Sequence, residues 1–150
     1  MECAPLWLWY SLALSCTAWI CYTDVRSFWI PDCPVVLLAL GNGLAWYAQL
    51  VRPAWTISLG VAAFFLFLYL FWPQSIGSGD IKLALALSPG CPAWGAWAML
   101  ISSFFLAALT ALALWRWQGK KVLPFGPFLL LGWWLAREPL LPLWPFGSIW

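Results

Sequence analysis

Long apolar runs with almost no charged residues occupy most of this 150-residue chain. A helix that crosses a bilayer needs about 20 predominantly apolar residues. Charged residues make up only 8% of the chain, whereas a soluble domain carries about a quarter. Such a chain cannot cover its own surface with polar groups, so we expect an all-α, polytopic integral membrane protein. The longest apolar runs are Pro5–Tyr22, Pro34–Val51, Ala54–Trp72 and Ala93–Trp117.

Two shorter apolar segments, Ile81–Ser88 and Phe128–Ala136, complete the pattern. The first is too short to cross a full bilayer unaided, so we expect it to be buried in protein or to cross a thinned membrane. The proline-containing tail, 137–150, either completes a sixth span or lies along the interface. Together the runs predict about six transmembrane helices in a single domain, 1–150. The first run lacks a preceding basic region, so we expect a retained helix rather than a signal peptide.

The distribution of basic residues predicts the orientation in the membrane. Cytoplasmic loops carry an excess of Lys and Arg. With the N-terminus outside, five basic residues lie inside and two lie outside. That orientation places the polar segments near Asp24 and Asp80 together on the cytoplasmic side. The inside residues are Arg26, Lys82, Arg116, Lys120 and Lys121, and the outside residues are Arg52 and Arg137.

Composition also excludes several kinds of function. The chain has no histidine, which rules out His-based catalysis and His metal ligation. Its five cysteines form no C-x-x-C motif, so we expect no metal site and no cofactor. The net charge of +2 is too small to suggest a nucleic-acid partner. The 15 tryptophans are typical of interfacial anchors and packing residues, with membrane lipids as partners.

Three aspartates, Asp24, Asp32 and Asp80, lie where apolar segments meet the predicted cytoplasmic loops. Acidic residues at a membrane boundary are costly and are therefore functional candidates. Two carboxyl groups held close together can share one proton, because both cannot ionise cheaply. One then acts as a base toward water while the other donates a proton to a carbonyl. This chemistry hydrolyses a peptide without a metal, a serine or a histidine.

The residues around Asp80 support a site, but they also allow simpler interpretations. Gly77 and Gly79 permit unusual backbone angles and close approach of another chain. Asp80 is expected at the start of the helix Ile81–Ser88, where the helix dipole favours a carboxylate. Lys82 is expected to pair with an acid or with lipid phosphate. Alternatively, Asp24 is a solvated loop residue and Asp80 is a helix N-cap. Asp32 is then a cap or turn residue at the start of the second span.

Three segments in order carry a family resemblance. Asp24 precedes Ile30-Pro31-Asp32 at the end of the first apolar run, Gly77-Ser78-Gly79-Asp80 follows the third, and Pro124-Phe125-Gly126-Pro127 precedes the last. In this order and spacing, over about Trp9 to Ala136, the chain resembles the type IV prepilin peptidases, a family of membrane aspartyl peptidases.

The resemblance implies a G-x-G-D aspartyl peptidase fold of six helices in the bacterial cytoplasmic (inner) membrane, with its active site facing the cytoplasm. Its implied substrates are prepilins or pilin-like secretion proteins, cut after a glycine between a short basic leader and an apolar helix. The paired Cys-x-x-Cys insertion linked to N-methylation is missing, so methyltransferase activity is not expected. The implied catalytic residues are Asp24 and Asp80, supported by Gly77, Gly79, Lys82, Pro31, Asp32, Pro124, Gly126 and Pro127.

Two other functions stay open on the residues alone. A small transporter or channel would use the acids along an ion path. A non-catalytic membrane subunit would keep them without using them. The presenilin-like G-x-G-D peptidases are a weaker match. They carry a Tyr-Asp pair and a Pro-Ala-Leu motif, whereas here Asp24 follows Thr23 and no Pro-Ala-Leu occurs.

Overall fold

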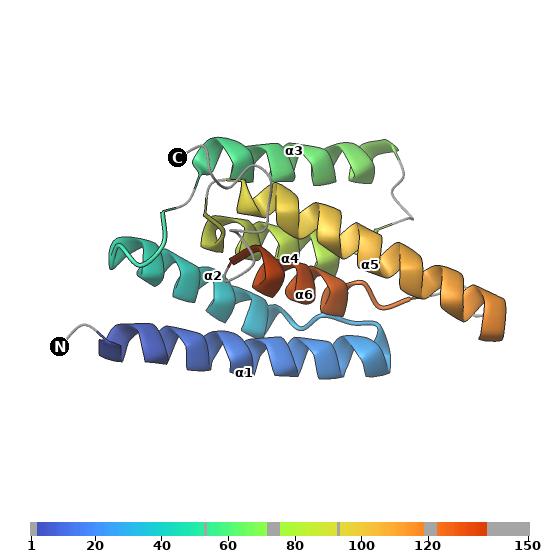
Figure 1. The fold of residues 1–150 in the computed structure, drawn as a ribbon, viewed down its shortest axis with the longest axis horizontal. Helices are drawn as coiled ribbons and strands as arrows, with labels where there is room; N and C mark the ends of the chain where they lie inside the picture. The colour runs from blue at the N-terminus through green and yellow to red at the C-terminus, as the bar shows by residue number, and fades with distance from the viewer. Residues whose placement is uncertain (1–2, 53, 72–75, 93, 119–122, 138–150) are drawn as a thin grey trace.

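A computed structural model describes residues 3–52, 54–71, 76–92, 94–118 and 123–137 (Figure 1). Over these residues the chain is helical and contains no strand, which confirms the all-α class. The elements are α1 (Cys3–Ser27), α2 (Asp32–Tyr47), α3 (Trp55–Phe71), α4 (Ser78–Leu87), the short 3-10 helix η1 (Ser88–Gly90), α5 (Gly95–Gln118) and α6 (Gly126–Arg137).

The short helix α4 lies in the middle of the bundle, in contact with α2, α3 and α6 (Figure 1). Its side chains Leu83, Ala84 and Leu87 are buried. The buried Asn42 of α2 donates a hydrogen bond of 2.9 Å from Nδ2 to the carbonyl of Ala86. One face of this segment is therefore buried in protein, while Leu85 on the same helix is 40% exposed, and whether the segment crosses the membrane stays a prediction. Its central position also places its N-terminus beside the end of α1 and the start of α2.

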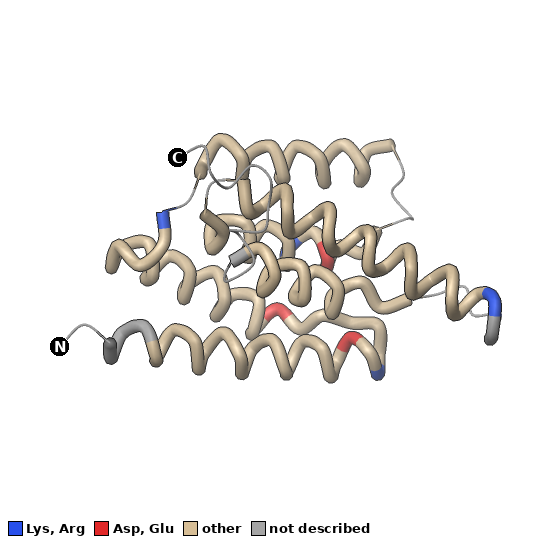
Figure 2. The backbone as a smooth tube through the Cα atoms, in the orientation of Figure 1, with Lys and Arg blue, Asp and Glu red and all other residues tan. Residues whose placement is uncertain are grey.

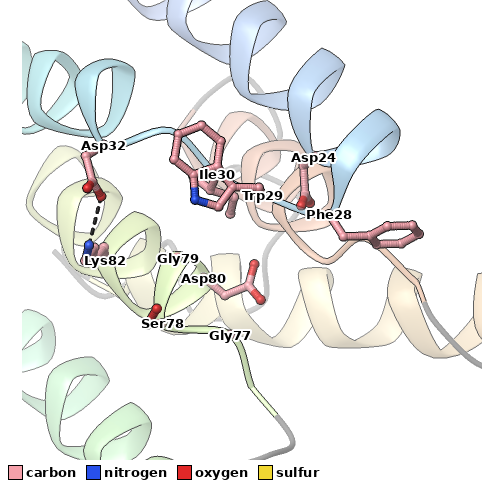
Figure 3. A pocket seen from close by; sticks show the side chains of 10 residues that line it. All are labelled: Asp24, Phe28, Trp29, Ile30, Asp32, Gly77, Ser78, Gly79, Asp80 and Lys82. Carbon is pink, nitrogen blue, oxygen red and sulfur yellow. Dashed lines mark hydrogen bonds and ion pairs between the residues drawn. The ribbon is translucent and has the colours of Figure 1, made fainter.

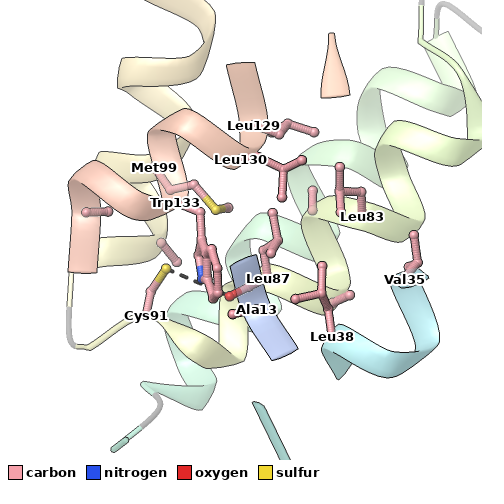
Figure 4. Packing of buried hydrophobic residues seen from close by; sticks show 14 of the residues in the cluster. Ala13, Val35, Leu38, Leu83, Leu87, Cys91, Met99, Leu129, Leu130 and Trp133 are labelled. Carbon is pink, nitrogen blue, oxygen red and sulfur yellow. Dashed lines mark hydrogen bonds between the residues drawn. The ribbon is translucent and has the colours of Figure 1, made fainter. Parts of the chain in front are cut away.

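The core is apolar and is built mainly where α6 meets α4 and α5. Trp133 of α6 is fully buried, as are Met99 of α5 and Leu87 of α4. Figure 4 shows these side chains packed together with Leu129 and Leu130. Helices α5 and α6 share the most extensive contact in the bundle. This packing holds the start of α6 in a defined place relative to α4.

Large apolar side chains also cover the outside of the bundle. Leu59 and Leu70 of α3 and Leu112 of α5 are each at least 60% exposed. Within the described residues, Gly95–Arg116 is the one helical stretch with both the length and the hydropathy to cross a membrane. Two further helical stretches, Trp55–Phe71 and Gly126–Ala136, are apolar but shorter. The number of spans therefore stays a prediction.

Charged residues are sparse, and the acidic ones within the described part of the chain gather in one region (Figure 2). Asp24 lies in α1, Asp32 opens α2, and Asp80 lies in the first turn of α4. The tail 137–150, on which the sixth span depends, and the basic residues Lys120 and Lys121 lie outside the described residues, apart from the backbone of Arg137.

Two predicted boundaries are wrong near these acids. The segment after Tyr22 is not a loop, because α1 continues to Ser27. The hydroxyl of Ser27 bonds to the Thr23 carbonyl at 2.7 Å, and Arg26 suits the negative end of the helix dipole. The second helix begins at Asp32 rather than at Pro34. Asp24 is therefore held by a helix and is not a solvated loop residue.

Close contact between α5 and α6 makes Gly132 sensitive to substitution. A Cβ at Gly132 would overlap Ser103 Oγ and lie 2.5 Å from the carbonyl oxygen of Met99. We expect Gly132→Ala to lower the free energy of unfolding by about 1–3 kcal/mol. A Cβ at Gly43 meets nothing within 4 Å, so Gly43→Ala is the matched control and should unfold at or above the wild-type temperature. Equal unfolding temperatures for the two variants would contradict this helix contact.

Candidate active site

A cavity of about 190 Å³ opens where α1 ends, α2 begins and α4 begins. Both candidate catalytic aspartates line it, and Figure 3 shows their carboxyl groups directed into the same space from different helices. The lining residues are Asp24, Phe28, Trp29, Ile30, Asp32, Gly77, Ser78, Gly79, Asp80 and Lys82.

Asp24 lies in the last turns of α1, two residues beyond the predicted span Pro5–Tyr22, and only 5% of its surface is exposed. The backbone N–H of Gly126 donates a hydrogen bond of 2.9 Å to its Oδ2. Burial raises the pKa of Asp24, and this hydrogen bond partly offsets the rise by favouring the carboxylate. The segment at the start of α6 therefore positions Asp24 from 102 residues away in the chain.

Asp80 is the third residue of α4, so it lies within the first helical turn. The N-cap is Gly77, so the interpretation of Asp80 as an N-cap is wrong. Burial, followed by the negative charge of Asp24, raises the pKa of Asp80 to about 6, although a hydrogen bond from the Gly77 backbone lowers it. The influence of Asp24 on Asp80 indicates that the two carboxyl groups interact across the cavity.

The two carboxyl groups have the properties that shared-proton chemistry requires. Asp24 is buried and Asp80 is partly buried, and the charge of Asp24 makes ionisation of Asp80 less favourable. The pair can therefore hold one proton between its members, with one carboxylate free to act as a base and one acid free to donate. Within the described part of the chain, no group of three or more Cys, Asp or Glu residues is placed to hold a metal ion.

Ile30 lies close to two of the glycines near the site. A Cβ at Gly79 would lie 3.1 Å from Ile30 Cβ, and a Cβ at Gly126 would lie 3.1 Å from Ile30 Cδ1. The buried Ile30 thus packs between the starts of α4 and α6. The predicted need for unusual backbone angles is wrong at Gly77, whose φ is −68°. The close neighbour at Gly79 is Ile30 of the same chain, so the predicted approach of another chain stays a prediction.

Some of the predicted supporting residues line the cavity, and others lie outside it. Lys82 Nζ lies 2.8 Å from Asp32 Oδ1, and this exposed ion pair forms one wall of the cavity (Figure 3). Asp32 is the first residue of α2, and its carboxylate pairs with Lys82. Pro31 is the N-cap of α2. Pro124 and Pro127 do not line the cavity; they flank Gly126 where α6 begins.

Sequence interpretation missed four lining residues, Phe28, Trp29, Ile30 and Ser78. Phe28 and Trp29 directly follow α1 and are 56% and 62% exposed. Ser78 lies inside the Gly77–Asp80 motif, and this position in the motif could have identified it as a residue of the site. No pattern around Phe28 distinguishes it from the many other aromatic residues of the chain.

Comparisons of the sequence with known proteins identify the family of the chain. The chain matches the type IV leader peptidase family over residues 11–115, a range that contains both aspartates and ends before Pro124. It is 29% identical over 128 aligned residues to a Stutzerimonas stutzeri protein named prepilin leader peptidase/N-methyltransferase. That match covers 75% of this chain and 43% of the relative, so the chain spans less than half of the relative's length. No solved structure matches. The chain belongs to the type IV leader peptidase family.

Proposed function

We propose that the chain is a membrane aspartyl endopeptidase that removes the leader peptide from type IV prepilins or pilin-like secretion proteins. The observation that carries this proposal is the pair Asp24 and Asp80, directed into one cavity from α1 and α4. Family membership supports the reaction class, because the name of the family describes peptidases that act on leader peptides.

The proposed location is the bacterial cytoplasmic membrane, with several helices crossing it in a G-x-G-D fold and the cavity facing the cytoplasm. Exposed apolar side chains on the outer helices support this location, because contiguous apolar surface of this kind is unfavourable in water. The basic residues Arg26, Lys82 and Arg116 support the orientation. The expected single domain, 1–150, is part of the same proposal.

In the proposed reaction, the ionised member of the pair takes a proton from a water molecule while the water oxygen attacks the scissile carbonyl carbon. The protonated member donates its proton to the carbonyl oxygen, which gives a neutral tetrahedral diol. Collapse of the diol breaks the C–N bond and passes a proton to the leaving amine. The products are a free carboxyl group on the leader and a free amino terminus on the mature protein. The proposal extends to peptide hydrolysis and not to methyl transfer.

The position of the pair suits a substrate that has a polar segment before the scissile bond and an apolar segment after it. A leader in the cytoplasm followed by an apolar helix in lipid would place the scissile bond at the membrane boundary. Asp24, two residues beyond the predicted span Pro5–Tyr22, lies at that boundary. This match is why we prefer a peptidase to a channel, in which acids would be spaced along a path.

Co-expression with a prepilin from the same organism tests the function. Mass spectrometry of the prepilin should show a new amino terminus directly after the glycine that precedes its apolar helix. Proteoliposomes containing the purified protein serve as the second arm. Ion flux that depends on Asp24 or Asp80, together with an uncleaved prepilin, would favour a transporter. An uncleaved prepilin without flux would favour a non-catalytic subunit.

The raised pKa of Asp80 predicts how stability depends on pH. An unfolded carboxyl has a pKa of about 3.9, whereas Asp80 in the folded protein has a pKa of about 6. Between these values the folded state binds more protons, so the free energy of unfolding falls as the pH rises from about 4 through about 6. Unfolding midpoints of Asp80→Asn and wild type should therefore agree near pH 4, with the variant higher near pH 7. Parallel curves for the two proteins would exclude this contribution.

A further inference from the structure

The short helix α4 carries Asp80, so its position along its own axis decides where that carboxyl group lies. Asp80 is in the first turn of α4, and Ala86 is in its last turn. A helix of ten residues is stiff over this length, and six residues span about 9 Å along its axis. A shift at the far end of α4 would therefore move Asp80 relative to Asp24, which the Gly126 N–H holds on α1.

The contacts that bury α4 are mostly apolar. Leu83, Ala84 and Leu87 are fully buried, and α4 lies against α2, α3 and α6. Figure 4 shows Leu83 and Leu87 within this apolar packing. Apolar attraction is non-directional, so it buries the helix without defining its position along the axis as sharply as a hydrogen bond does.

Two directional side-chain contacts join α4 to another helix within the described residues, and both partners lie on α2. The Lys82–Asp32 pair is exposed on both sides, and exposed pairs are weak. The other contact is buried, since Asn42 is 1% exposed and its Nδ2 donates to the Ala86 carbonyl oxygen at 2.9 Å. The last four carbonyl groups of a helix have no partner within it, so this bond also satisfies one of them.

The surroundings of the Asn42 amide leave it little freedom to move. A Cβ at Gly90, just after α4, would lie 2.6 Å from Asn42 Oδ1 and 2.8 Å from Nδ2, so Gly90 lies directly against the amide. Within the described residues Oδ1 accepts no hydrogen bond, which is unfavourable for a buried polar atom. An apolar side chain would avoid this cost, so stability alone does not account for an asparagine here.

We infer that Asn42 is a positioning residue for the peptidase reaction. Its bond to Ala86 fixes α4 along its axis and so sets the place of Asp80 opposite Asp24. This inference rests on the proposed peptidase function. Neither Asn42 nor Ala86 lines the cavity, so the effect is exerted through α4 and not through contact with the substrate. Loss of the bond should therefore slow the chemical step and leave substrate binding nearly unchanged.

The test separates this hydrogen bond from the packing around it. Asn42→Leu keeps a branched side chain but cannot donate to Ala86. Asn42→Ala/Gly90→Ala removes the amide and places a methyl group in the space that the amide occupies, so much of the packing is kept. Thr17→Val is the matched control, because it removes a different bond between helices, the 3.2 Å contact from Trp134 Nε1 to Thr17 Oγ1.

The rate constant and KM are measured on one purified prepilin, and thermal unfolding shows that each variant is folded. Asn42→Leu and Asn42→Ala/Gly90→Ala should each lower kcat by at least about tenfold with little change in KM. Thr17→Val should cleave at the wild-type rate. In an Asp80→Asn background, Asn42→Leu should cause no further loss, because the carboxyl group that Asn42 positions is already absent.

Several outcomes would overturn the inference. One is a wild-type kcat for both Asn42→Leu and Asn42→Ala/Gly90→Ala. Another is an equal loss for Thr17→Val, which would show that any missing bond between helices slows the reaction. A further loss of about tenfold from Asn42→Leu in the Asp80→Asn background would show that Asn42 acts by a route other than Asp80. If the wild type itself cleaves no prepilin, the proposed function fails, and that result is distinct from all of these.

Discussion

Replacing either Asp24 or Asp80 with asparagine is expected to slow leader cleavage by about 10²–10⁴-fold while the protein still inserts into the membrane. Asparagine keeps the shape of the side chain but cannot accept or release the proton that the reaction needs. Loss of either carboxyl group leaves the other without the partner that shares its proton. Purified variants are compared with wild type on one prepilin under single-turnover conditions, so that product release does not hide the chemical step.

Asp32→Asn is the matched control, because it makes the same chemical change on the wall of the same cavity. Asp32 is exposed and paired with Lys82, and exposed ion pairs contribute only about 0–1 kcal/mol. The rate of Asp32→Asn should therefore stay within about tenfold of the wild type. A normal rate for Asp24→Asn or Asp80→Asn would show that the carboxyl group concerned takes no part in the reaction.

Gly126→Ala is expected to slow cleavage by about 10²-fold, although the new methyl group is small. A Cβ at Gly126 would lie 2.8 Å from Asp24 Oδ2 and 3.1 Å from Ile30 Cδ1. Relief of this overlap requires Asp24 to move away from the N–H that holds it. Displacing a reacting group by about 1 Å is enough for a loss of this size. The same single-turnover assay measures the loss.

Gly43→Ala controls for the general effect of adding a methyl group to a helix, since it meets no atom within 4 Å. Its cleavage rate should equal the wild-type rate. If Gly126→Ala also cleaves at the wild-type rate while folding normally, the contact between the start of α6 and Asp24 has no role in the reaction. A thermal unfolding curve for Gly126→Ala separates a misplaced carboxyl group from general loss of structure.

The sequence was sufficient to predict the helical class and most of the candidate site. Apolar run lengths located the helices to within a few residues, because a chain so poor in charge has few alternatives. Asp24 and Asp80 stood out for the same reason, as costly groups at the ends of apolar runs. The order of the three motifs then selected Gly126 as a supporting residue, although nothing in the pattern indicated which atom it would contact.

Contacts between distant residues were beyond the sequence pattern. The bond from Gly126 to Asp24 joins residues 102 positions apart, and it depends on how α6 packs against α4 and α5. The partner of Lys82 was left open between an acid and a lipid, and the bundle brings Asp32 to it. The left-handed conformation of Phe28 was also missed, because glycine is the usual signal for that conformation and none is present.

The double variant Asp24→Asn/Asp80→Asn tests most directly whether the two aspartates work as one pair. Residues that act as a unit show strongly non-additive losses, because removing the first already disables the second. The double variant should therefore cleave prepilin as slowly as the slower single variant, and no slower. A further loss of about 10²-fold, as expected when two independent contributions multiply, would contradict the account.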